Sequence, residues 1–247
     1  MGKKYKNPPI IETLCEFAFI PSKPWDITIP GLFYEKVRNK FPERKQRVGF
    51  DIKFEPKEGG IEQNIEMAAP RIQFLRSDKT ALLQVSTDLL VINHLKPYPT
   101  WNKFKPMILE NLNYYKDVAN PKGFKRIGLR YINKIDIPGK SIKMEDYFNF
   151  YPAIPKELPQ THLTFNINVK IPYANNHEYL VLTLRDSISE KPDFVSVVLD
   201  LYYIMSMPGK VAFQQVDEWI ENAHTTIEKA FESCITDKCR KLFEEGE

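Results

Sequence analysis

Alternating apolar and polar positions predict two β-strands of similar design. The first covers residues 10–20 in the segment PPIIETLCEFAFIP and is bounded by prolines on both sides. The second covers residues 125–137 in the segment KRIGLRYINKIDIP. One face of this second strand is mostly apolar. The opposite face combines Arg126, Gly128, Arg130 and Lys134 with Ile132 and Asp136. One face therefore suits a hydrophobic core, and the other is either solvated or binds a partner.

Apolar residues spaced three or four apart predict the helices. One is expected within residues 29–41, and another from Thr100 onward, with Thr100 as its N-cap. A short helical piece, MEDYFNF, covers residues 144–150. The longest helix is expected over about residues 211–243. Its apolar seam consists of Val216, Ile220, Ala223, Ile227, Ala230 and Cys234.

Seven short runs between turn signals complete the expected strands. They cover residues 48–56, 61–68, 71–77, 81–95, 162–172, 178–186 and 194–204. The chain thus has the order strand, helix, several strands and helix, and then the same order again. This order predicts an α+β fold in which residues 1–120 and 121–247 form two similar halves of one compact unit. It resembles TATA-binding-protein-like and helix-grip-like folds, with a largely antiparallel sheet, helices on one side and a long C-terminal helix.

The composition is that of a globular protein. Of the 247 residues, 43% are hydrophobic and 27% are charged, and no apolar run approaches the roughly 18 residues of a membrane span. The opening MGKKYKNPP lacks the apolar core of a signal peptide. Cys15, Cys234 and Cys239 match neither a zinc site nor a disulfide framework. We therefore expect a cytoplasmic protein with free thiols, no membrane attachment and no cofactor.

Charge is unevenly distributed along the chain, although the net charge is only +3. Residues 36–47 carry six basic residues against one acidic residue, and residues 96–130 carry eight against two. Residues 213–247 carry nine acidic residues against four basic ones. The basic segments either bind nucleic acid or an acidic partner, or form solvated faces with internal salt bridges. The candidate contact residues are Arg126, Arg130 and Lys134, together with Lys36, Arg38, Arg44 and Arg47.

The basic face of the second strand has the same two interpretations. Alternate residues on it lie about 6.5–7 Å apart, near the phosphate repeat of an extended nucleic-acid strand. Gly128 either lets another backbone approach closely or marks a β-bulge. The first strand presents Glu12 and Glu16 where the second presents arginine and lysine. The opposite charges could therefore pair across a pseudo-twofold seam instead of meeting a ligand.

The sequence contains no recognisable catalytic or metal-binding motif. It has no HExxH, Walker, GxGxxG or GxSxG pattern and no evident carboxylate pair for acid–base work. The histidines, His94, His162, His177 and His224, are scattered along the chain. A metal site or an active site would have to be assembled from distant segments, so we assign no catalytic and no metal-binding residue.

Four segments together resemble one family of prokaryotic proteins. They are NPPIIETLCEF, RIGLRYINKI, YPTWNKFKPMILENLNYY and the C-terminal stretch VDEWIENAHTTIEKAFESCIT. The family is sporadically distributed among bacteria and archaea and has no established activity, so the resemblance implies no catalytic residue. Its patchy occurrence implies a place in a defence or mobile-element locus, as an accessory or antitoxin-like component, and a cytoplasmic location.

Three functions follow as hypotheses. The first is a non-catalytic binding or interaction protein with a protein partner or nucleic acid, which the charge distribution and the resemblance favour. The second is a small-molecule-binding protein that encloses its ligand between the sheet and the long helix. A pocket with converging polar groups would support it. The third is an enzyme with a site assembled between the two halves, which a cluster of His94, His162, His177 or His224 with carboxylates would support.

Overall fold

The computed structural model describes residues 5–47, 50–57, 60–67, 70–160 and 163–244. The strands are β1 (Ile10–Ile20), β2 (Glu43–Arg47), β3 (Phe50–Lys57), β4 (Gly60–Met67), β5 (Arg71–Leu75), β6 (Ala81–Ser86), β7 (Leu89–Leu95), β8 (Gly123–Pro138), β9 (Asn166–Tyr173), β10 (Glu178–Ser187) and β11 (Phe194–Met205). The α-helices are α1 (Ile29–Val37), α2 (Trp101–Ala119), α3 (Met144–Tyr147), α4 (Val216–Cys234) and α5 (Asp237–Glu244).

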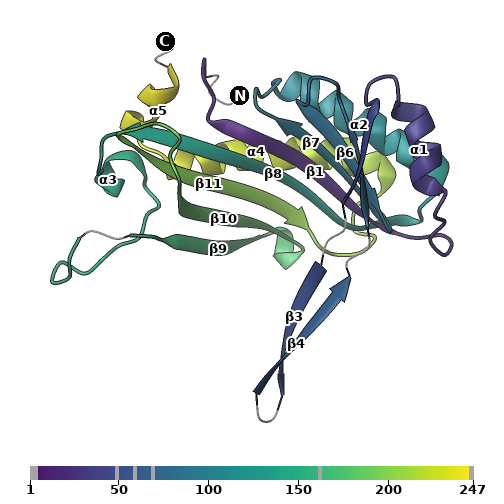
Figure 1. The fold of residues 1–247 in the computed structure, drawn as a ribbon, viewed down its shortest axis with the longest axis horizontal. Coiled ribbons are helices and arrows are strands. Elements are labelled where there is room, and N and C mark those ends of the chain that lie inside the picture. The colour runs from purple at the N-terminus through teal and green to yellow at the C-terminus, as the bar shows by residue number, and fades with distance from the viewer. Residues whose placement is uncertain (1–4, 48–49, 58–59, 68–69, 161–162, 245–247) are drawn as a thin grey trace.

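Nine of these strands form one sheet with the order β2-β5-β6-β7-β1-β8-β11-β10-β9. Every neighbouring pair in the sheet is antiparallel. The remaining strands, β3 and β4, form a separate hairpin that projects from the sheet (Figure 1). The α+β class and the antiparallel sheet are therefore confirmed. The expected strands at 48–56 and 61–68 correspond to β3 and β4, although residues 48–49 and 68 lie outside the described residues.

The helices cover one side of the sheet. Helices α1 and α2 lie behind the strands of the first part of the chain, and α4 crosses behind β8 and β11 (Figure 1). We call this side the helix face and the other side, on which the described chain places no helix, the open face. Large side chains fill the space between sheet and helices, including Phe17, Phe33, Phe104, Tyr115 and Phe124. Burying them supplies most of the driving force for folding.

The period-two pattern of β8 determines which of its side chains reach this core. Residues 127 to 137 alternate between buried and half-buried along most of the strand. Ile127, Leu129 and Tyr131 are buried on the helix face, whereas Arg126 and Arg130 are half-buried on the open face. The predicted assignment of the two faces of this strand is confirmed.

The chain near the C-terminus differs from the expected single helix over residues 211–243. Helix α4 ends at Cys234, and Ile235 adopts an extended conformation that forms a β-bridge with Phe148. The Thr236 hydroxyl then accepts a hydrogen bond from the backbone N–H of Cys239, 3.3 Å away. A hydroxyl that bonds a backbone N–H three residues later is a helix N-cap, so it starts α5. The apolar seam is correct as far as Cys234.

Two further local differences concern strands. Residues 43–47 form an edge strand, β2, which was not among the expected strands. The expected run 81–95 is two strands, because a turn containing Asp88, with φ of 51°, separates β6 from β7. Thr100 is at the expected N-cap position of α2, with φ of 80°, but its side chain makes no cap hydrogen bond. No helix in the described part of the chain is long and apolar enough to cross a membrane.

The absence of a side chain at Gly128 makes room for the side chain of another residue. No backbone approaches closely there, and the glycine does not lie in a β-bulge. It pairs in register with Glu16 of β1, and the register shifts of this strand pair lie elsewhere. A Cβ atom at Gly128 would come closer than 3.0 Å to three atoms of the Tyr202 side chain. Tyr202 donates a hydrogen bond to Glu16 (3.3 Å), and the Arg130 guanidinium lies 5.5 Å from its ring centre. The tyrosine ring therefore occupies the space above the glycine.

We predict that Gly128→Ala destabilises the protein by about 1–3 kcal/mol, because an added methyl group overpacks a site that Glu16 and Arg130 hold in place. Chemical denaturation measures the loss. Gly31→Ala is the matched control, since a Cβ there has nothing within 4 Å and alanine favours the helix. Adding Tyr202→Ala to Gly128→Ala should recover part of the loss. Strictly additive effects of the two changes would contradict the packing explanation.

Candidate functional site

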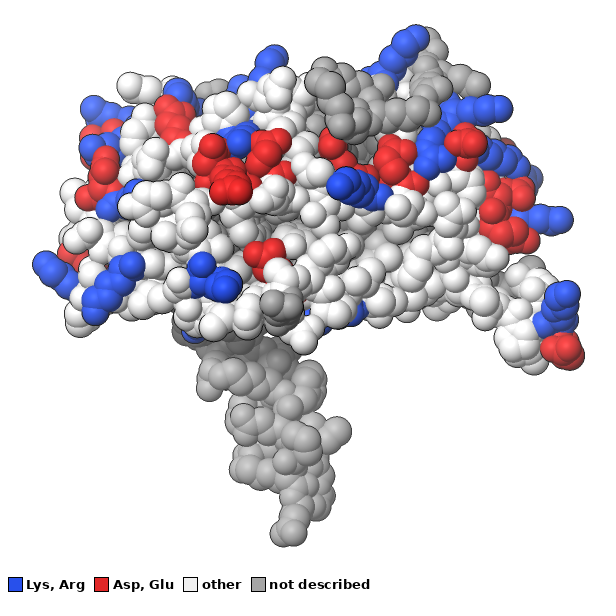
Figure 2. All heavy atoms as spheres, turned by 180° about the vertical axis from the view of Figure 1, so that it is seen from behind, with Lys and Arg blue, Asp and Glu red and all other residues white. Residues whose placement is uncertain are grey.

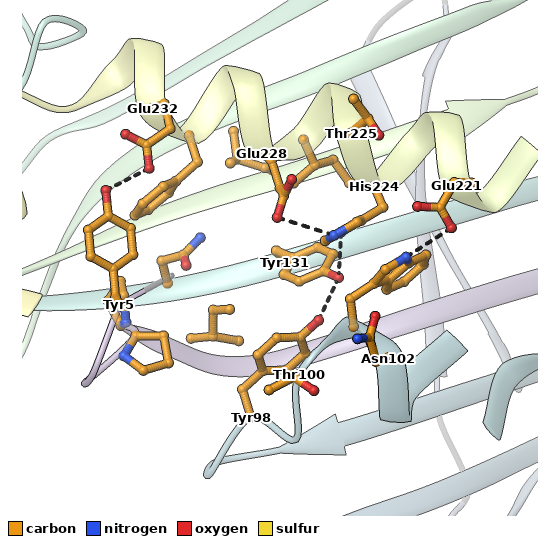
Figure 3. A pocket seen from close by; sticks show the side chains of 18 of the residues that line it. Tyr5, Tyr98, Thr100, Asn102, Tyr131, Glu221, His224, Thr225, Glu228 and Glu232 are labelled. Carbon is orange, nitrogen blue, oxygen red and sulfur yellow. Dashed lines mark hydrogen bonds and ion pairs between the residues drawn. The ribbon is translucent and has the colours of Figure 1, made fainter. Parts of the chain in front are cut away.

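A pocket of about 720 Å³ lies between α4, β8, the segment preceding β1 and the start of α2. Figure 3 shows its polar side chains, with the acidic ones projecting from α4 toward β8. Its floor is formed by buried residues of the sheet and of α4, namely Tyr131, Asn133, Leu201 and Ile227. Thr100, Asn102 and Thr225 lie at the exposed rim. The pocket is therefore open to solvent at the rim and closed by the core below.

One stripe of α4 supplies the carboxylates and the histidine among the described residues that line the pocket. Glu221, His224, Thr225, Glu228 and Glu232 follow one another at intervals of one, three or four residues, and all of them line the pocket. Residues three and four apart share a helix face. This stripe lies beside the apolar seam that packs on the sheet, so the same helix presents a core face and a pocket face.

A series of polar contacts crosses the pocket floor from Tyr98 to Glu228 (Figure 3), and the first two of them are hydrogen bonds. The Tyr98 and Tyr131 hydroxyl oxygens lie 3.0 Å apart, and the Tyr131 hydroxyl lies 3.0 Å from His224 Nδ1. On the other side of the ring, His224 Nε2 lies 3.2 Å from Glu228 Oε1. Both nitrogens of His224 are thus engaged, and the series links the loop before α2, the central strand β8 and α4.

Trp101 fixes the imidazole from one side. Its ring stacks on His224 with the centroids 4.0 Å apart and the planes 15° from parallel. Its indole N–H donates to Glu221 Oε2 (3.1 Å), which also accepts from Lys105 (2.7 Å). The Lys105 ammonium lowers the pKa of Glu221, so this carboxylate is ionised at neutral pH.

The segment preceding β1 closes the opposite side of the pocket. Tyr5 donates its hydroxyl hydrogen to Glu232 (2.6 Å), and its ring packs edge-on against Phe231 and Phe243. Glu232 also accepts from Arg240 Nε (2.8 Å). This wall therefore depends on contacts between the start of the chain and the two C-terminal helices.

Burial determines the ionisation of the floor groups. It lowers the pKa of His224 to about 4, against a smaller opposing effect of the Glu221 carboxylate. It also raises the pKa of Tyr98 and of Tyr131 far above the usual value for a phenol. At neutral pH the imidazole and both phenols are therefore uncharged.

The predicted contact residues of β8 are paired within the protein. Arg126 forms an ion pair with Glu16 of β1. Arg130 forms a bidentate pair with Asp200 of β11, with 2.8 Å between Nε and Oδ1. Lys134 Nζ lies 3.4 Å from Glu190. The expected pairing across the β1–β8 seam thus holds for Glu16.

Glu12 behaves differently from Glu16 at this seam. It accepts a hydrogen bond from the Asn93 amide of β7 (2.7 Å), whereas Arg130, which faces the same side, bonds to Asp200. Of Glu12 and Glu16 on β1, only Glu16 therefore forms an ion pair with a basic residue of β8.

The other predicted contact residues do not join the β8 residues in one surface. Arg47 shares the open face and donates to Gln73 (3.1 Å), at the far edge of the sheet. Lys36 pairs with Asp117 of α2 (3.9 Å), and Arg38 pairs with Glu35 (3.1 Å). The Arg44 guanidinium lies 4.8 Å from the ring centre of Tyr34 in α1. Lys36, Arg38 and Arg44 therefore lie with the helix layer.

Folding mixes the charges that the sequence separates. Lys105, from the basic segment 96–130, pairs with both Asp217 and Glu221 from the acidic segment 213–247. Lys40, from the basic segment 36–47, pairs with Glu110. On the helix side of the molecule, acidic and basic side chains intermingle and form no broad area of one sign (Figure 2). The segregation along the chain therefore becomes local ion pairing.

The histidines do not assemble into a common site. His94 is buried on β7 beside Phe104, His177 follows the turn after β9, and His224 lies in the pocket. His162 lies outside the described residues. Within the described ranges, no group of three or more His, Cys, Asp or Glu residues is arranged to hold a metal ion.

Sequence reasoning named His224 as one candidate for an enzyme site, but it missed the other polar residues of the pocket, which carry only a weak signal. His224 and Glu228 are four residues apart on a predicted helix, and glutamates recur along the same stripe. Like charges four residues apart destabilise an isolated helix. The recurring glutamates beside the apolar seam therefore lower the intrinsic stability of the helix, and their presence needs an explanation. Nothing in the sequence pairs this stripe with Tyr98 or Tyr131, which reach it only in the folded chain.

The sequence matches no known protein-family model and no curated protein sequence.

We predict that the Arg130–Asp200 pair is structural. Arg130→Leu would leave the Asp200 carboxylate, whose side chain is only 11% exposed, without its counter-ion. We expect a loss of about 1–3 kcal/mol on chemical denaturation. Combining it with Asp200→Leu should restore most of the stability, because no charge is then left unpaired. If the two losses simply add, the pair has no energetic coupling.

We predict that His224 makes the protein less stable in mild acid. Its pKa in the folded state is about 4, below the value of about 6.5 in an unfolded chain. Below pH 6.5 the unfolded state therefore binds a proton that the folded state does not, and stability falls until about pH 4. The contribution reaches about 3 kcal/mol at most.

Comparison with His224→Gln isolates this contribution, because carboxylates also titrate in the same range. Urea denaturation from pH 7 to pH 4 should show a steeper loss for the natural protein than for the variant. Equal slopes would show that His224 does not stay neutral in the folded state.

Proposed function

We propose that this protein binds a small molecule in the pocket between α4 and β8. The observation that carries the proposal is the convergence of Tyr98, Tyr131, His224 and Glu228 on one cavity of about 720 Å³. Ligand pockets typically measure about 300–1,000 Å³ and combine apolar walls with a few fixed polar groups. The pocket agrees with that description in size, in lining and in its buried floor.

The polar groups of the floor favour binding over catalysis. A general acid or base needs a nitrogen or oxygen that faces the substrate. Both nitrogens of His224 already contact Tyr131 and Glu228, and the ring stacks on Trp101. These contacts hold the imidazole in one orientation. We therefore propose that His224 helps to orient a ligand and does not itself exchange a proton with it.

A division of the chain into two similar halves is consistent with the position of the pocket between α4 and β8. The strand order places β1 and β8 at the centre, with β7 beside β1 and β11 beside β8. We propose that residues 1–120 and 121–247 are the equivalent halves of a TATA-binding-protein-like or helix-grip-like sheet, in which α4 encloses the ligand of the second half. The resemblance to sporadically distributed prokaryotic proteins supports a cytoplasmic accessory or antitoxin-like role in a defence or mobile-element locus.

A second candidate function is contact with a protein or nucleic acid through the open face. The observation that favours it is that the Arg126 and Arg130 side chains stay 43% and 37% exposed although each pairs with a carboxylate. An anionic partner would have to compete with Glu16 and Asp200 for these guanidinium groups. That competition makes this function the weaker of the two.

We predict that Thr225→Trp blocks ligand binding, because the residue lies at the exposed rim of the pocket and indole is large enough to fill its mouth. Asn222→Trp is the matched control, since Asn222 is also exposed on α4 but lies away from the pocket lining. The measurement is thermal unfolding against a metabolite library. A ligand at one hundred times its Kd stabilises by about 2.7 kcal/mol, or a Tm increase of about 5–10 °C.

The same proteins, purified under native conditions and extracted with solvent, provide a second measurement by mass spectrometry. The natural protein and Asn222→Trp should retain a small molecule that Thr225→Trp lacks. The proposal fails if no library compound raises Tm and no extracted compound differs between the two variants.

A further inference from the structure

The two edge strands of the nine-stranded sheet, β2 and β9, differ in length and in charge. β2 has the sequence ERKQR, in which four of the five residues are charged. Short strands and charged side chains are usual means by which a protein keeps a sheet edge from pairing with another chain. β9 has the sequence NINVKIPY, with eight residues and a single charge. The β2 edge is therefore protected by its composition, and the β9 edge is not.

The described chain leaves the β9 edge uncovered. Six of the eight residues of β9 are exposed, and none of them is buried. The pairing of β9 with β10 is continuous from Asn166 to Tyr173, so no β-bulge bends the strand away from a neighbour. The backbone groups on the outer side of β9 can therefore accept another strand.

Pro172 indicates which backbone groups point outward. It lies opposite Tyr179 of β10, and a proline in an edge strand has its missing N–H on the solvent side. In an antiparallel strand, the groups that point to one side recur at every second residue. Asn166, Asn168 and Lys170 therefore each present an N–H and a C=O at the outer side.

The polar side chains of β9 do not obstruct this edge. Lys170 Nζ lies 3.6 Å from the ring centre of Tyr179 in β10, so the single charge is turned back over the sheet. Asn168 donates from Nδ2 to Thr183 Oγ1 of β10 (2.7 Å), in the same inward direction. A lysine protects an edge strand when its charge stands at the edge, and Lys170 does not stand there.

Apolar side chains of β9 lie at the rim of the helix face, beyond the helices. Ile167, Val169 and Ile171 pair with residues of β10 that are buried on this face, yet Val169 is 39% exposed. Five of the nine exposed large hydrophobic residues of the described chain lie within residues 151–173. They are Tyr151, Leu158, Leu163, Val169 and Tyr173. Such a concentration of exposed apolar side chains is typical of a protein interaction surface.

We propose that β9 pairs antiparallel with β9 of a second copy of this chain, so that two nine-stranded sheets become one. A two-fold axis at Asn168 places this residue opposite its own copy and places Lys170 opposite Asn166. Three pairs of residues then exchange two backbone hydrogen bonds each, without using Pro172. The register separates the two Lys170 charges and brings the apolar rims of both copies together.

The features of both edges favour a second copy bound through β9. Pairing of β9 with β2 of another copy would bring Lys170 to a strand with three basic residues, and it would add further copies without limit. A two-fold pair of β9 strands closes after two copies, because both remaining edges are the charged β2. The apolar residues at 151–163 also make the surface wider than one added strand, which a folded partner with the same rim covers.

This interface is independent of the proposed function, because β9 contributes no residue to the described lining of the pocket. Analytical ultracentrifugation of the full chain, from about 1 to about 100 µM, covers the range in which such a contact is expected to form. The natural protein should change from one copy to two as its concentration rises.

Val169→Lys should weaken the dimer at least tenfold, because it places two like charges in the apolar rim near the axis. Ile27→Lys is the matched control, since Ile27 is 86% exposed in the segment before α1, and this change should leave the dimer intact. Circular dichroism confirms that both variants fold.

A cysteine cross-link tests the register. The three natural cysteines are buried, so Asn168→Cys provides an exposed thiol that faces its own copy across the axis. Residues in such a pair have Cα atoms about 5.5 Å apart, which a disulfide can bridge. Oxidation with copper phenanthroline in air should link two chains through Asn168→Cys. Lys45→Cys, at the middle of the β2 edge, is the matched control and should give no linked dimer.

A protein that stays monomeric at every concentration overturns the inference and leaves the β9 edge to an extended peptide of another protein. A dimer that Val169→Lys does not weaken, or equal cross-linking through Lys45→Cys, shows that the copies meet elsewhere and also overturns it. Thr225→Trp should leave the dimer unchanged, so loss of ligand binding and loss of the dimer are separate results.

Discussion

The antiparallel pairing of β1 with β8 at the centre of the sheet is the contact on which the rest of the structure depends. It joins strands more than one hundred residues apart in sequence, with Glu12 opposite Ile132 and Phe17 opposite Ile127. Because β1 also pairs with β7 and β8 with β11, both parts of the chain share one sheet and one helix face. A single hydrophobic core then forms under α1, α2 and α4. Because β1 and β8 pair with each other, neither of them is an exposed edge strand.

The same pairing positions the pocket. Tyr131 lies on β8 beside the seam, so its ring reaches the helix face at the middle of the sheet, where the segment preceding β1, the start of α2 and the stripe of α4 converge. Glu228 lies 3.2 Å from His224 of the same helix. The other two glutamates of that stripe have partners from elsewhere: Lys105 for Glu221 and Arg240 for Glu232. A helix that served only the core would not need such a face, and locally unfavourable residues of this kind are expected where a protein binds something.

Sequence patterns foretold those parts of the structure that depend on local periodicity. The strand at 10–20, the two faces of β8 and the apolar seam of α4 follow from side-chain spacing alone, and the structure has all three. The errors occurred where a distant contact overrides the local pattern. The break after Cys234 depends on the bridge between Ile235 and Phe148, and β2 forms at residues 43–47 because β5 offers it an edge. Gly128 is explained only by Tyr202, which lies 74 residues further along the chain.

The candidate site was less predictable than the fold because it depends on contacts between distant segments rather than on residue types. His224, Tyr131 and Tyr98 are each unremarkable in the sequence, and a buried tyrosine or histidine is most often a core residue that has satisfied its own polar atom. What distinguishes them is that three such groups are joined in series and end on a carboxylate. Tyr98 precedes α2, Tyr131 lies on β8 and His224 lies on α4, so these three groups come from separate elements. The contacts between them therefore exist only in the folded chain, and no local sequence pattern can reveal them.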